Sequence, residues 1–598
     1  MAVPFKGCFM IRQIVAGAGL FVLAASGPVL AQPQQGDARL ASTIAAYEQL
    51  ERRVDPLTAG GEGDRAALRR LPDVSPQAVA ALKRDLGALR AQLSQAPDHG
   101  LNDADTINRA FLMRVISESI EGIDFDEARM PISNGDGFFT LMSGLAYNTP
   151  IRSSDDAEAW IARLEAAPLW YQQNIANARR GIATRWVQPR IVSERALATA
   201  RAQIDTMTDT LLLPLAQLPS TISAADQQRY RDRARAIIHD QILPQQQATV
   251  TFLQNEYLPH SRATIGLNAL PNGRVYYSYL ARSYTTTTMT PEAIHALGVS
   301  EVARIRAEME HQIQASGFHG DFAAFVTFLH TDPQFYARTP EELTMRYAEV
   351  AKRADAQLPR LFSTLPRLTY GIRPIPAETA EGSTTAYYTQ GSPALGQSGT
   401  YWINLTHLDQ RPLYEMPALT LHESVPGHHL QIALAQEQGE LPYYRRNANV
   451  TAFIEGWGLY AESLGVDMGM YRTPYERFGR LSYEMWRACR LVADTGIHWM
   501  GWDIEQARQC FAQNTALSPH NIQTELERYV ATPGQALAYK IGELNFQSLR
   551  RDATQALGSR FDIRAFHDEL LGAGALPIDL LNTRVRAWIA AQETSARH

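Results

Sequence analysis

Hydrophobic side chains recur at helical spacing along most of the chain. One example begins at Thr290, a good N-cap residue before a proline, and continues with apolar residues at positions 294, 297, 302 and 305. Thr339 and Thr473 also precede a proline and a glutamate at capping-box spacing. Residues 40–93 and 157–213 are rich in Ala, Leu, Arg and Gln with the same periodicity. These patterns predict a mainly α-helical protein.

The chain shows no repeat of fixed period and no low-complexity linker. We therefore expect residues 32–598 to form a single helical domain, either undivided or built from two lobes. One stretch, residues 371–399, is instead rich in Pro, Gly, Ser and Thr, and the segments 386–389 and 400–405 look extended. They predict a small antiparallel β-ribbon, which either covers the core or holds an extended substrate by main-chain hydrogen bonds.

The first 31 residues have the pattern of a secretory signal peptide. Lys6 and Arg12 precede an apolar stretch at residues 14–29, and the pattern ends at Val29-Leu30-Ala31 before Gln32. Cleavage near Ala31 predicts a periplasmic or secreted protein, and the missing cysteine at that point argues against lipoprotein processing. No other segment reaches about 20 apolar residues, so we expect no membrane anchor after processing.

Charge and cysteine content restrict the expected partners and the possible covalent cross-links. The chain has 56 basic and 62 acidic side chains, and loss of the signal peptide makes it more acidic, so we expect no nucleic-acid partner. The mature chain keeps Cys489 and Cys510. An oxidising compartment permits a bridge between them, but two buried thiols are equally compatible with the sequence.

Residues 422–429 read His-Glu-Ser-Val-Pro-Gly-His-His and suggest a zinc site. Zinc in hydrolases takes three ligands from His and carboxylate side chains and leaves a fourth position for water. His422 and His428, with Glu455 from the following helical segment, supply such a set for one Zn²⁺ ion. Glu423, beside the first ligand, is the candidate general base.

The spacing of the histidines requires a break in the helix. His422 and His428 are six residues apart, which on an unbroken helix is about 9 Å along the axis and on different sides. Pro426 and Gly427 lie between them and can interrupt the helix, which would let both imidazoles reach one ion. His429 is the alternative ligand, on the face of His422 but roughly 10 Å along the axis. We favour His428.

The same histidines can also be ordinary polar residues at a helix end. The apolar run directly before the His-Glu pair, and the later segment around Glu455, favour the metal site. Glu462, seven residues after Glu455, is expected to orient a ligand imidazole rather than to bind the ion. Trp457 and Tyr460 are expected to pack in the core.

Several longer segments resemble a known bacterial family. They are GRVYY at 273–277, TPEAIHALG at 290–298, HESVPGHHLQ at 422–431, EGW at 455–457, DTGIH at 494–498 and PGQALAYKIG at 533–542. Together they are similar to the domain-of-unknown-function 885 (DUF885) family, whose members resemble zinc metallopeptidases. The resemblance covers most of the mature chain.

The resemblance implies a mainly helical, gluzincin-like fold with a substrate cleft, similar to thermostable carboxypeptidases, neurolysin and angiotensin-converting enzyme. It also implies that the histidine directly after Pro-Gly, His428, is a ligand and that Glu455 is the third. The chain departs from the family at Gly458, where alanine is more usual. Glycine at this position is expected to loosen the helix slightly.

Two of the matched segments contain candidates for further roles. Hydrolysis through a tetrahedral intermediate needs a donor for the oxyanion, and His498 or Tyr539 can supply it, although each is equally compatible with a structural role. Arg490 and Lys540, and with them Arg487, are candidates for binding the terminal carboxylate of a peptide. The arginines can instead form ion pairs within their helix.

We therefore expect a zinc metallopeptidase of the carboxypeptidase, dipeptidase or oligopeptidase type that cleaves short peptides with metal-activated water. Two other functions fit the sequence: a zinc-dependent esterase or amidase acting on non-peptide substrates, and a periplasmic protein that binds a metal or peptide without catalysis. A serine hydrolase is less attractive because no Gly-x-Ser-x-Gly motif is present.

Overall fold

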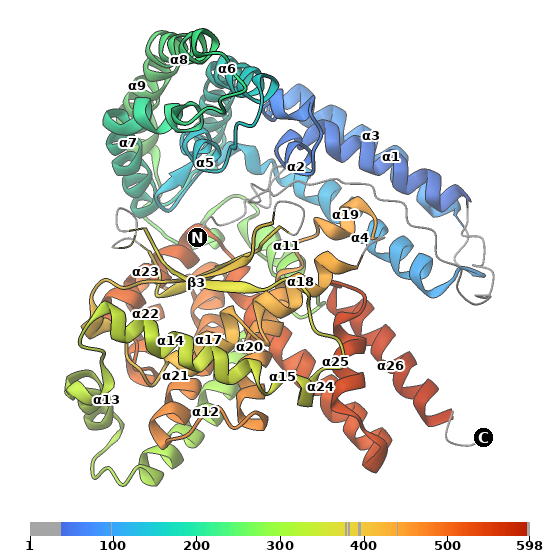
Figure 1. Cartoon of the computed structure of the whole chain (residues 1–598), viewed down its shortest axis with the longest axis vertical. Coiled ribbons are helices and arrows are strands. Elements are labelled where there is room, and N and C mark those ends of the chain that lie inside the picture. Colours follow the sequence, from blue (N-terminus) through green and yellow to red (C-terminus); the bar gives the residue numbers. More distant parts are fainter. Residues whose placement is uncertain are drawn as a thin grey trace. The chain divides into compact units, whose positions relative to one another are not determined.

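The computed structural model describes residues 38–594, apart from residues 97–98, 377–379, 381–382, 393–395 and 439–440 (Figure 1). The expected signal peptide lies outside these residues. Most of the described chain is α-helical, which confirms the predicted fold class. It divides into two compact units between Ile265 and Gly266. No described helix is both long enough and apolar enough to cross a membrane.

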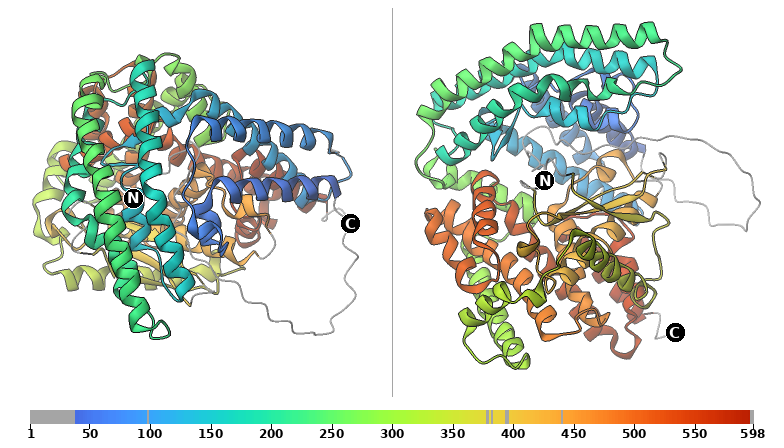
Figure 2. Two further views of the ribbon diagram at one scale, coloured as in Figure 1. Left: turned by 90° about the horizontal axis from the view of Figure 1, so that it is seen from above. Right: turned by 60° about the vertical axis from the view of Figure 1, so that its left-hand side comes forward.

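The N-terminal unit, which ends at Ile265, is built around its own hydrophobic core. Trp160 and Tyr171 of one long helix and Leu211 of the next are almost fully buried in it. Helices α6 to α9 of this unit pack against one another (Figure 2). Its elements are α1 (Ala38–Val54), α2 (Pro56–Gly61), α3 (Pro76–Gln95), α4 (Asp103–Phe125), β1 (Ile132–Ser133), β2 (Asp136–Gly137), α5 (Leu141–Tyr147), α6 (Ser154–Thr184), α7 (Arg190–Ala216), α8 (Ala224–Ile237), α9 (Leu243–Phe252) and α10 (Leu258–His260).

The C-terminal unit, which begins at Gly266, contains all the candidate site residues. Helix α12 packs along α21, and α20 packs along α24. Its helices are α11 (Gly273–Thr285), α12 (Pro291–Ala315), α13 (Phe322–Thr331), α14 (Pro340–Asp355), α15 (Leu358–Leu361), α17 (Met416–Glu423), α18 (His428–Glu437), α19 (Tyr443–Arg446), α20 (Thr451–Asp467), α21 (Pro474–Thr495), α22 (Ile504–Asn514), α23 (Pro519–Ala531), α24 (Ala538–Leu557), α25 (Ile563–Leu571) and α26 (Ile578–Thr594).

The predicted helix starts are present in the structure. The Thr290 hydroxyl accepts a hydrogen bond from the main-chain N–H of Ala293, and Thr473 forms a complete capping box with Glu476. Thr339 caps α14 as expected, but the carboxylate of Glu342 accepts from the N–H of Arg338 rather than from that of Thr339. The box at Thr339 is therefore only half formed, although the helix still begins there.

A small three-stranded sheet lies beside the helices of the C-terminal unit. Strands β4 (Ala386–Thr389) and β5 (Gly399–Ile403) form the predicted antiparallel ribbon. Strand β3 (Tyr370–Pro374), which the sequence did not reveal, pairs in parallel with the other side of β5, so the strand order is β3-β5-β4. Strand β4 is thus an edge of the described sheet, and it contacts α17.

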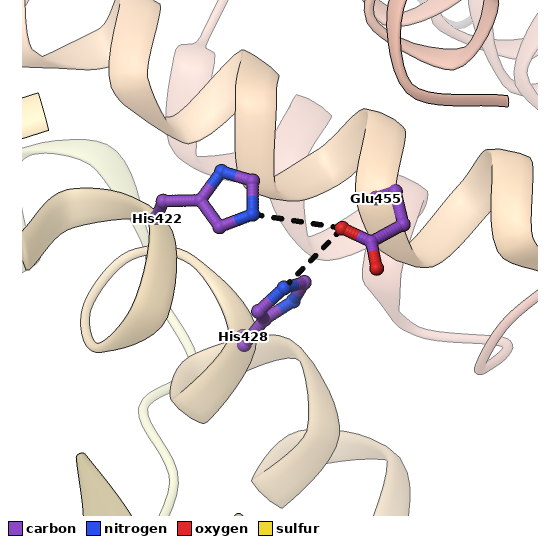
Figure 3. A group of neighbouring side chains, drawn as sticks. All are labelled: His422, His428 and Glu455. Carbon is purple, nitrogen blue, oxygen red and sulfur yellow. Dashed lines mark ion pairs between the residues drawn. The ribbon is translucent and has the colours of Figure 1, made fainter. Parts of the chain in front are cut away.

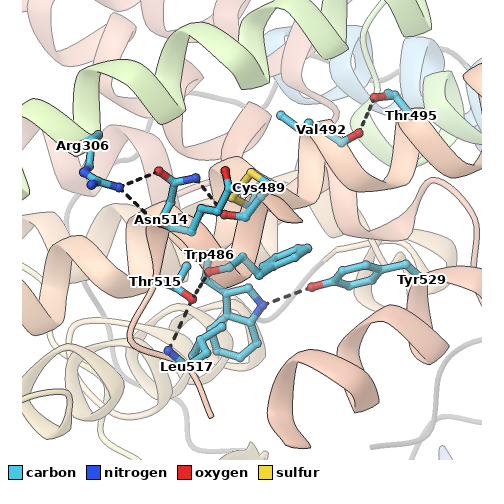
Figure 4. Close-up of a disulfide and its surroundings, with 12 residues drawn as sticks. Arg306, Trp486, Cys489, Val492, Thr495, Asn514, Thr515, Leu517 and Tyr529 are labelled. Atoms are coloured by element: carbon cyan, nitrogen blue, oxygen red, sulfur yellow. Dashed lines mark hydrogen bonds between the residues drawn. A yellow bond between two sulfur atoms is a disulfide. The ribbon is translucent and has the colours of Figure 1, made fainter. Parts of the chain in front are cut away.

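Cys489 and Cys510 form a disulfide that joins α21 to α22 (Figure 4). The two Cα atoms are 5.7 Å apart, within the range that disulfide geometry allows. Of the two states that the sequence allowed, the structure has the bridged one. The bond ties down the helix that also carries Arg487 and Arg490.

We predict that replacing both cysteines with alanine lowers the free energy of unfolding of the C-terminal unit by about 3 kcal/mol. Without the disulfide, the unfolded chain is no longer restricted by a closed loop and gains conformational entropy. Urea unfolding without reductant measures this difference. Adding reductant should weaken the wild-type protein and leave the double variant unchanged. Equal unfolding of the oxidised wild type and the variant would contradict a stabilising bridge.

Candidate metal centre

The two candidate histidines lie on separate helices that meet at a tight turn. Helix α17 ends at Glu423 and α18 begins at His428, so the predicted interruption at Pro426 and Gly427 is present. A side chain on Gly427 would place its Cβ 2.0 Å from the carbonyl oxygen of His422. Only glycine therefore fits at this position without moving the main chain.

The turn is also held from the neighbouring helix. The indole N–H of Trp457 in α20 donates a hydrogen bond of 2.8 Å to the carbonyl of Pro426. Trp457 is fully buried, as is Tyr460, whose hydroxyl lies 3.0 Å from Nε2 of His567. Both residues pack in the core as predicted, and Trp457 additionally fixes the position of the turn relative to α20.

His422, His428 and Glu455 converge at the end of the turn (Figure 3). The Nε2 atoms of both histidines lie 3.6 Å from the same carboxylate oxygen, Oε2 of Glu455. One ligand atom from each of the three residues lies within 4.8 Å of the others. Two zinc–ligand bonds at a tetrahedral angle place their ligand atoms about 3.4 Å apart. The donor set and its spacing therefore fit a zinc ion.

A second carboxylate orients His422 from behind. Its Nδ1 lies 2.8 Å from Oε1 of Glu462, which also pairs with Arg487 at 3.3 Å. This contact fixes the imidazole with Nδ1–H as donor and Nε2 facing Glu455. Burial lowers the pKa of His422, but Glu455 and Glu462 outweigh it and raise the pKa to about 9. A metal that binds here must therefore displace a proton.

Gly458 leaves room for the same imidazole. A Cβ at this position would lie 2.7 Å from Cε1 of His422, closer than real contacts allow. The sequence suggested only that glycine loosens the helix. In the structure the more important effect is steric, because His422 occupies the space that an alanine side chain would fill.

Glu423 is the last residue of α17, and its side chain is only 8% exposed. Burial raises the pKa of Glu423, and the nearby charge of Glu455 raises it further. His422 and His428 lower the pKa of Glu423. Glu423 directly follows the candidate ligand His422 and is buried at the end of the same helix, a position compatible with the predicted role of a base.

His429 faces away from the cluster. Its Nδ1 lies 2.9 Å from the hydroxyl of Tyr388 and its Nε2 lies 3.0 Å from the carbonyl oxygen of Leu368. Burial lowers its pKa to about 4, so the ring is neutral, with Nε2–H donating to Leu368 and Nδ1 accepting from Tyr388. The alternative ligand is therefore excluded by geometry, and His429 instead connects α18 to strand β4.

Two of the predicted site residues have structural roles instead. Nδ1 of the fully buried His498 accepts from the N–H of Leu267, and its Nε2 lies 3.0 Å from the carbonyl oxygen of Tyr529. Because both nitrogens are engaged by the main chain, His498 has no donor left for an oxyanion. The proposed catalytic role of His498 is thus wrong.

Lys540 does not bind substrate either. It is fully buried, and its ammonium group contacts the carboxylates of Glu301, Glu484 and Glu543 at 3.1, 2.8 and 2.5 Å. These carboxylates outweigh the effect of burial and keep the pKa of Lys540 above its usual value. Its role is to neutralise a buried acidic group.

Tyr539 and Arg490 are the remaining predicted site residues. Burial raises the pKa of Tyr539, and the carboxylate of Glu455 raises it further. The guanidinium carbon of Arg490 lies 4.2 Å from the centre of the Tyr539 ring. Arg490 pairs with Glu525 at 3.1 Å. Sequence reasoning missed this partner because Glu525 belongs to a helix whose pairing with α21 leaves no local signal.

The fold and the cluster together define a helical protein with two buried histidines and a half-buried glutamate that suit a metal ion. The chain belongs to the family "Bacterial protein of unknown function (DUF885)", whose model matches residues 56–585. The predicted family is therefore confirmed. The likeness of this family to zinc metallopeptidases stays a prediction.

Solved structures share this fold. A "putative lipoprotein" from Colwellia psychrerythraea is 27% identical, with a TM-score of 0.84 over 92% of this chain and 98% of that chain. A "putative lipoprotein of unknown function" from Shewanella oneidensis is 18% identical, with a TM-score of 0.69 over 91% and 98% of the two chains. At that identity the second structure supports the fold alone. No match was found among curated proteins.

The two adjacent histidines provide a matched test of the metal centre. We predict that His428→Gln weakens zinc binding by more than about 100-fold, because a ligand is removed. Loss of a residue that only hydrogen-bonds to a ligand costs roughly 10–100-fold. His429→Gln should leave the zinc affinity unchanged. Competition with a chromophoric chelator measures both affinities, and circular dichroism checks that both variants fold. Equal losses in the two variants would contradict the assignment of His428.

Proposed function

We propose that the protein is a zinc-dependent hydrolase, most directly a metallopeptidase that cleaves short peptides. The observation that carries this proposal is the convergence of His422, His428 and Glu455 with the buried carboxyl group of Glu423 beside them. Two imidazoles and one carboxylate form a ligand set that suits zinc and leaves a fourth coordination position. A purely structural site would not need Glu423.

Zinc held by these three residues would activate a water molecule and polarise the substrate carbonyl. Glu423 would take a proton from that water and pass it to the leaving amine, because it is the carboxylate beside the ligands that is not itself a ligand. Glu462 keeps the imidazole of His422 in the orientation that directs Nε2 toward Glu455. The residues thus divide into ligands, a base and a positioning group.

Tyr539 is the best candidate for stabilising the oxyanion. It lies at the start of α24, and α24 packs on α20 so closely that a Cβ on Gly456 would be 2.5 Å from Cα of Gly542. This contact brings the tyrosine near Glu455, which precedes Gly456. A hydroxyl group that donates a hydrogen bond to the developing oxyanion lowers the activation free energy by about 3 kcal/mol in such sites.

The edge strand offers a place for an extended substrate. Strand β4 pairs with β5 on one side only within the described sheet, and Tyr388 of β4 contacts His429 of α18. An added peptide strand would be held by main-chain hydrogen bonds beside the helices that carry the ligands. This arrangement supports peptides over compact esters as substrates.

We further propose that the protein acts outside the cytoplasm. The signal-like pattern of residues 1–31 and the disulfide between Cys489 and Cys510 both favour an oxidising compartment. The similar protein from Colwellia is described as a putative lipoprotein, a class of protein that is exported. This chain has no cysteine near Ala31, so we propose a free rather than a lipid-anchored form.

The central test replaces the base and leaves the ligands intact. We predict that Glu423→Gln binds zinc normally but loses about 10²–10⁴-fold in kcat, because proton transfer is removed. Zinc content and the hydrolysis of a peptide library measure the two effects. In the wild type, chelation should abolish turnover and zinc should restore it.

Glu415→Gln is the matched control. Glu415 precedes α17, and its side chain is 8% exposed, like that of Glu423. Burial raises the pKa of Glu415 to about 8, so the amide changes little charge at neutral pH. This variant should retain activity. If Glu423→Gln were as active as Glu415→Gln, the catalytic proposal would fail. If the wild type hydrolysed esters but not peptides, the protein would be an esterase rather than a peptidase.

A further inference from the structure

A second polar cluster lies beside the ring of Tyr539. Its centre is Arg490 in α21, whose guanidinium carbon is 4.2 Å from the ring centre of Tyr539 and 4.7 Å from that of Trp486. The Nε of Arg490 donates to the hydroxyl of Tyr529 at 3.0 Å, and Nη2 pairs with Glu525 at 3.1 Å. Trp486 donates to the same hydroxyl (Figure 4).

This cluster has more positive than negative charge. Burial alone would raise the pKa of Glu525, but Arg528 and Arg490 hold it at about 2, so Glu525 is ionised. One carboxylate therefore faces two guanidinium groups. The next carboxyl group is that of Asp494, which accepts hydrogen bonds from Tyr277 and Gly534. Burial raises the pKa of Asp494 to about 7, so its negative charge balances the positive charge of the cluster only in part.

One donor of Arg490 has no acceptor. The residue is 4% exposed, and within the described chain its Nη1 atom makes no hydrogen bond. A buried guanidinium donor without an acceptor costs about 1–3 kcal/mol or more, so proteins rarely leave one unsatisfied unless a ligand or water completes it. The open Nη1 and the excess positive charge both indicate an anionic ligand.

The ligand would lie close to the reacting bond. Tyr539 links Arg490 to the metal cluster, since its ring contacts Arg490 and it lies three residues before Gly542, which packs against Gly456 beside Glu455. We therefore place a group bound by Nη1 near the candidate zinc site. Arginine suits a carboxylate because its planar fork matches the two oxygens.

The other basic residues do not offer such a site. Both terminal nitrogens of Arg487 have acceptors, Nη1 at the carbonyl of Tyr483 and Nη2 at Glu462. Lys540 is enclosed by three carboxylates. Nε of Arg487 also lacks an acceptor among the described residues, but of these three side chains only Arg490 has a terminal nitrogen, Nη1, without one and a guanidinium group over the ring of Tyr539.

We propose that Arg490 binds a carboxylate of the substrate, so that the peptides cleaved carry a free carboxylate close to the scissile bond. The proposal rests on the peptidase function above and assigns its substrate class. The carboxylate is either the C-terminus of the peptide or an acidic side chain. Both present the same two oxygens, and the substrates below distinguish them.

The kinetic test compares a short alanine peptide with its C-terminal amide, and an amidated peptide containing aspartate with one containing asparagine. We expect the wild type to prefer the free acid, or the aspartate peptide, by 10-fold or more in kcat/KM. Arg490→Gln should remove this preference by lowering kcat/KM for the carboxylate substrate alone. Hydrolysis by the wild type without any preference would overturn the carboxylate site while leaving the hydrolase intact.

Arg445→Gln is the matched control, because Arg445 is buried in the same unit and donates to the main-chain carbonyl of Ala573. It should keep the substrate preference. Arg490→Lys retains the charge without the fork and should keep part of the preference, and it provides a second variant if the glutamine variant fails to fold. Equal losses for acid and amide in both Arg490 variants would show a merely structural role.

A binding measurement separates this inference from the proposed function. Isothermal titration of the full-length Glu423→Gln protein with an acetylated alanine tripeptide, and with its amide, needs no turnover. Tighter binding of the acid that disappears in the Glu423→Gln, Arg490→Gln double variant supports the site even if no peptide is hydrolysed. Equal binding of acid and amide by the Glu423→Gln protein, together with equal binding of the amidated aspartate and asparagine peptides, overturns it.

Discussion

The candidate site depends on one break in the main chain, the turn between α17 and α18. A continuous helix would carry the imidazoles of His422 and His428 about 9 Å apart and to different sides. Because Gly427 has no side chain, the main chain can pass within contact distance of the His422 carbonyl, and α18 can begin anew with His428. Trp457 holds this turn against α20, the helix that supplies Glu455. The geometry of the cluster follows from these contacts.

Buried charged side chains surround the cluster of metal ligands. Glu462 pairs with both His422 and Arg487, so the orientation of a ligand ring is tied to α21. The same helix is joined to α22 by the disulfide and carries Arg490 toward Tyr539. Buried charges of this kind are costly unless paired. They therefore restrict the relative positions of α20, α21 and α24, which together surround the candidate centre.

Much of this arrangement could be predicted from the sequence, since its signals are local. The helical periodicity, the cap at Thr290 and the interruption at Gly427 each depend on residues within one or two turns of each other. The choice of His428 over His429 also followed from the local Pro-Gly pair together with the family resemblance. The β4–β5 ribbon was recognisable from its alternating segments, but the parallel partner β3 was not, because its pairing spans about 30 residues without a periodic signal.

The roles of individual polar residues could not be predicted in the same way. His498 is engaged by Leu267, 231 residues earlier, and Lys540 by Glu301 and Glu484 from two other helices. A histidine or lysine in such a motif has the same sequence signature whether its partner is a substrate or a distant main-chain group. Only the fold shows which donors are already used, and it leaves Nη1 of Arg490 without an acceptor among the described residues.

The most direct test of this account is a crystal structure of the zinc-loaded protein with anomalous diffraction recorded at the zinc absorption edge. The account predicts one strong peak about 2.0–2.2 Å from Nε2 of His422, Nε2 of His428 and a carboxylate oxygen of Glu455. The absence of a peak among these three residues, or a peak bound to His429 instead, would contradict it.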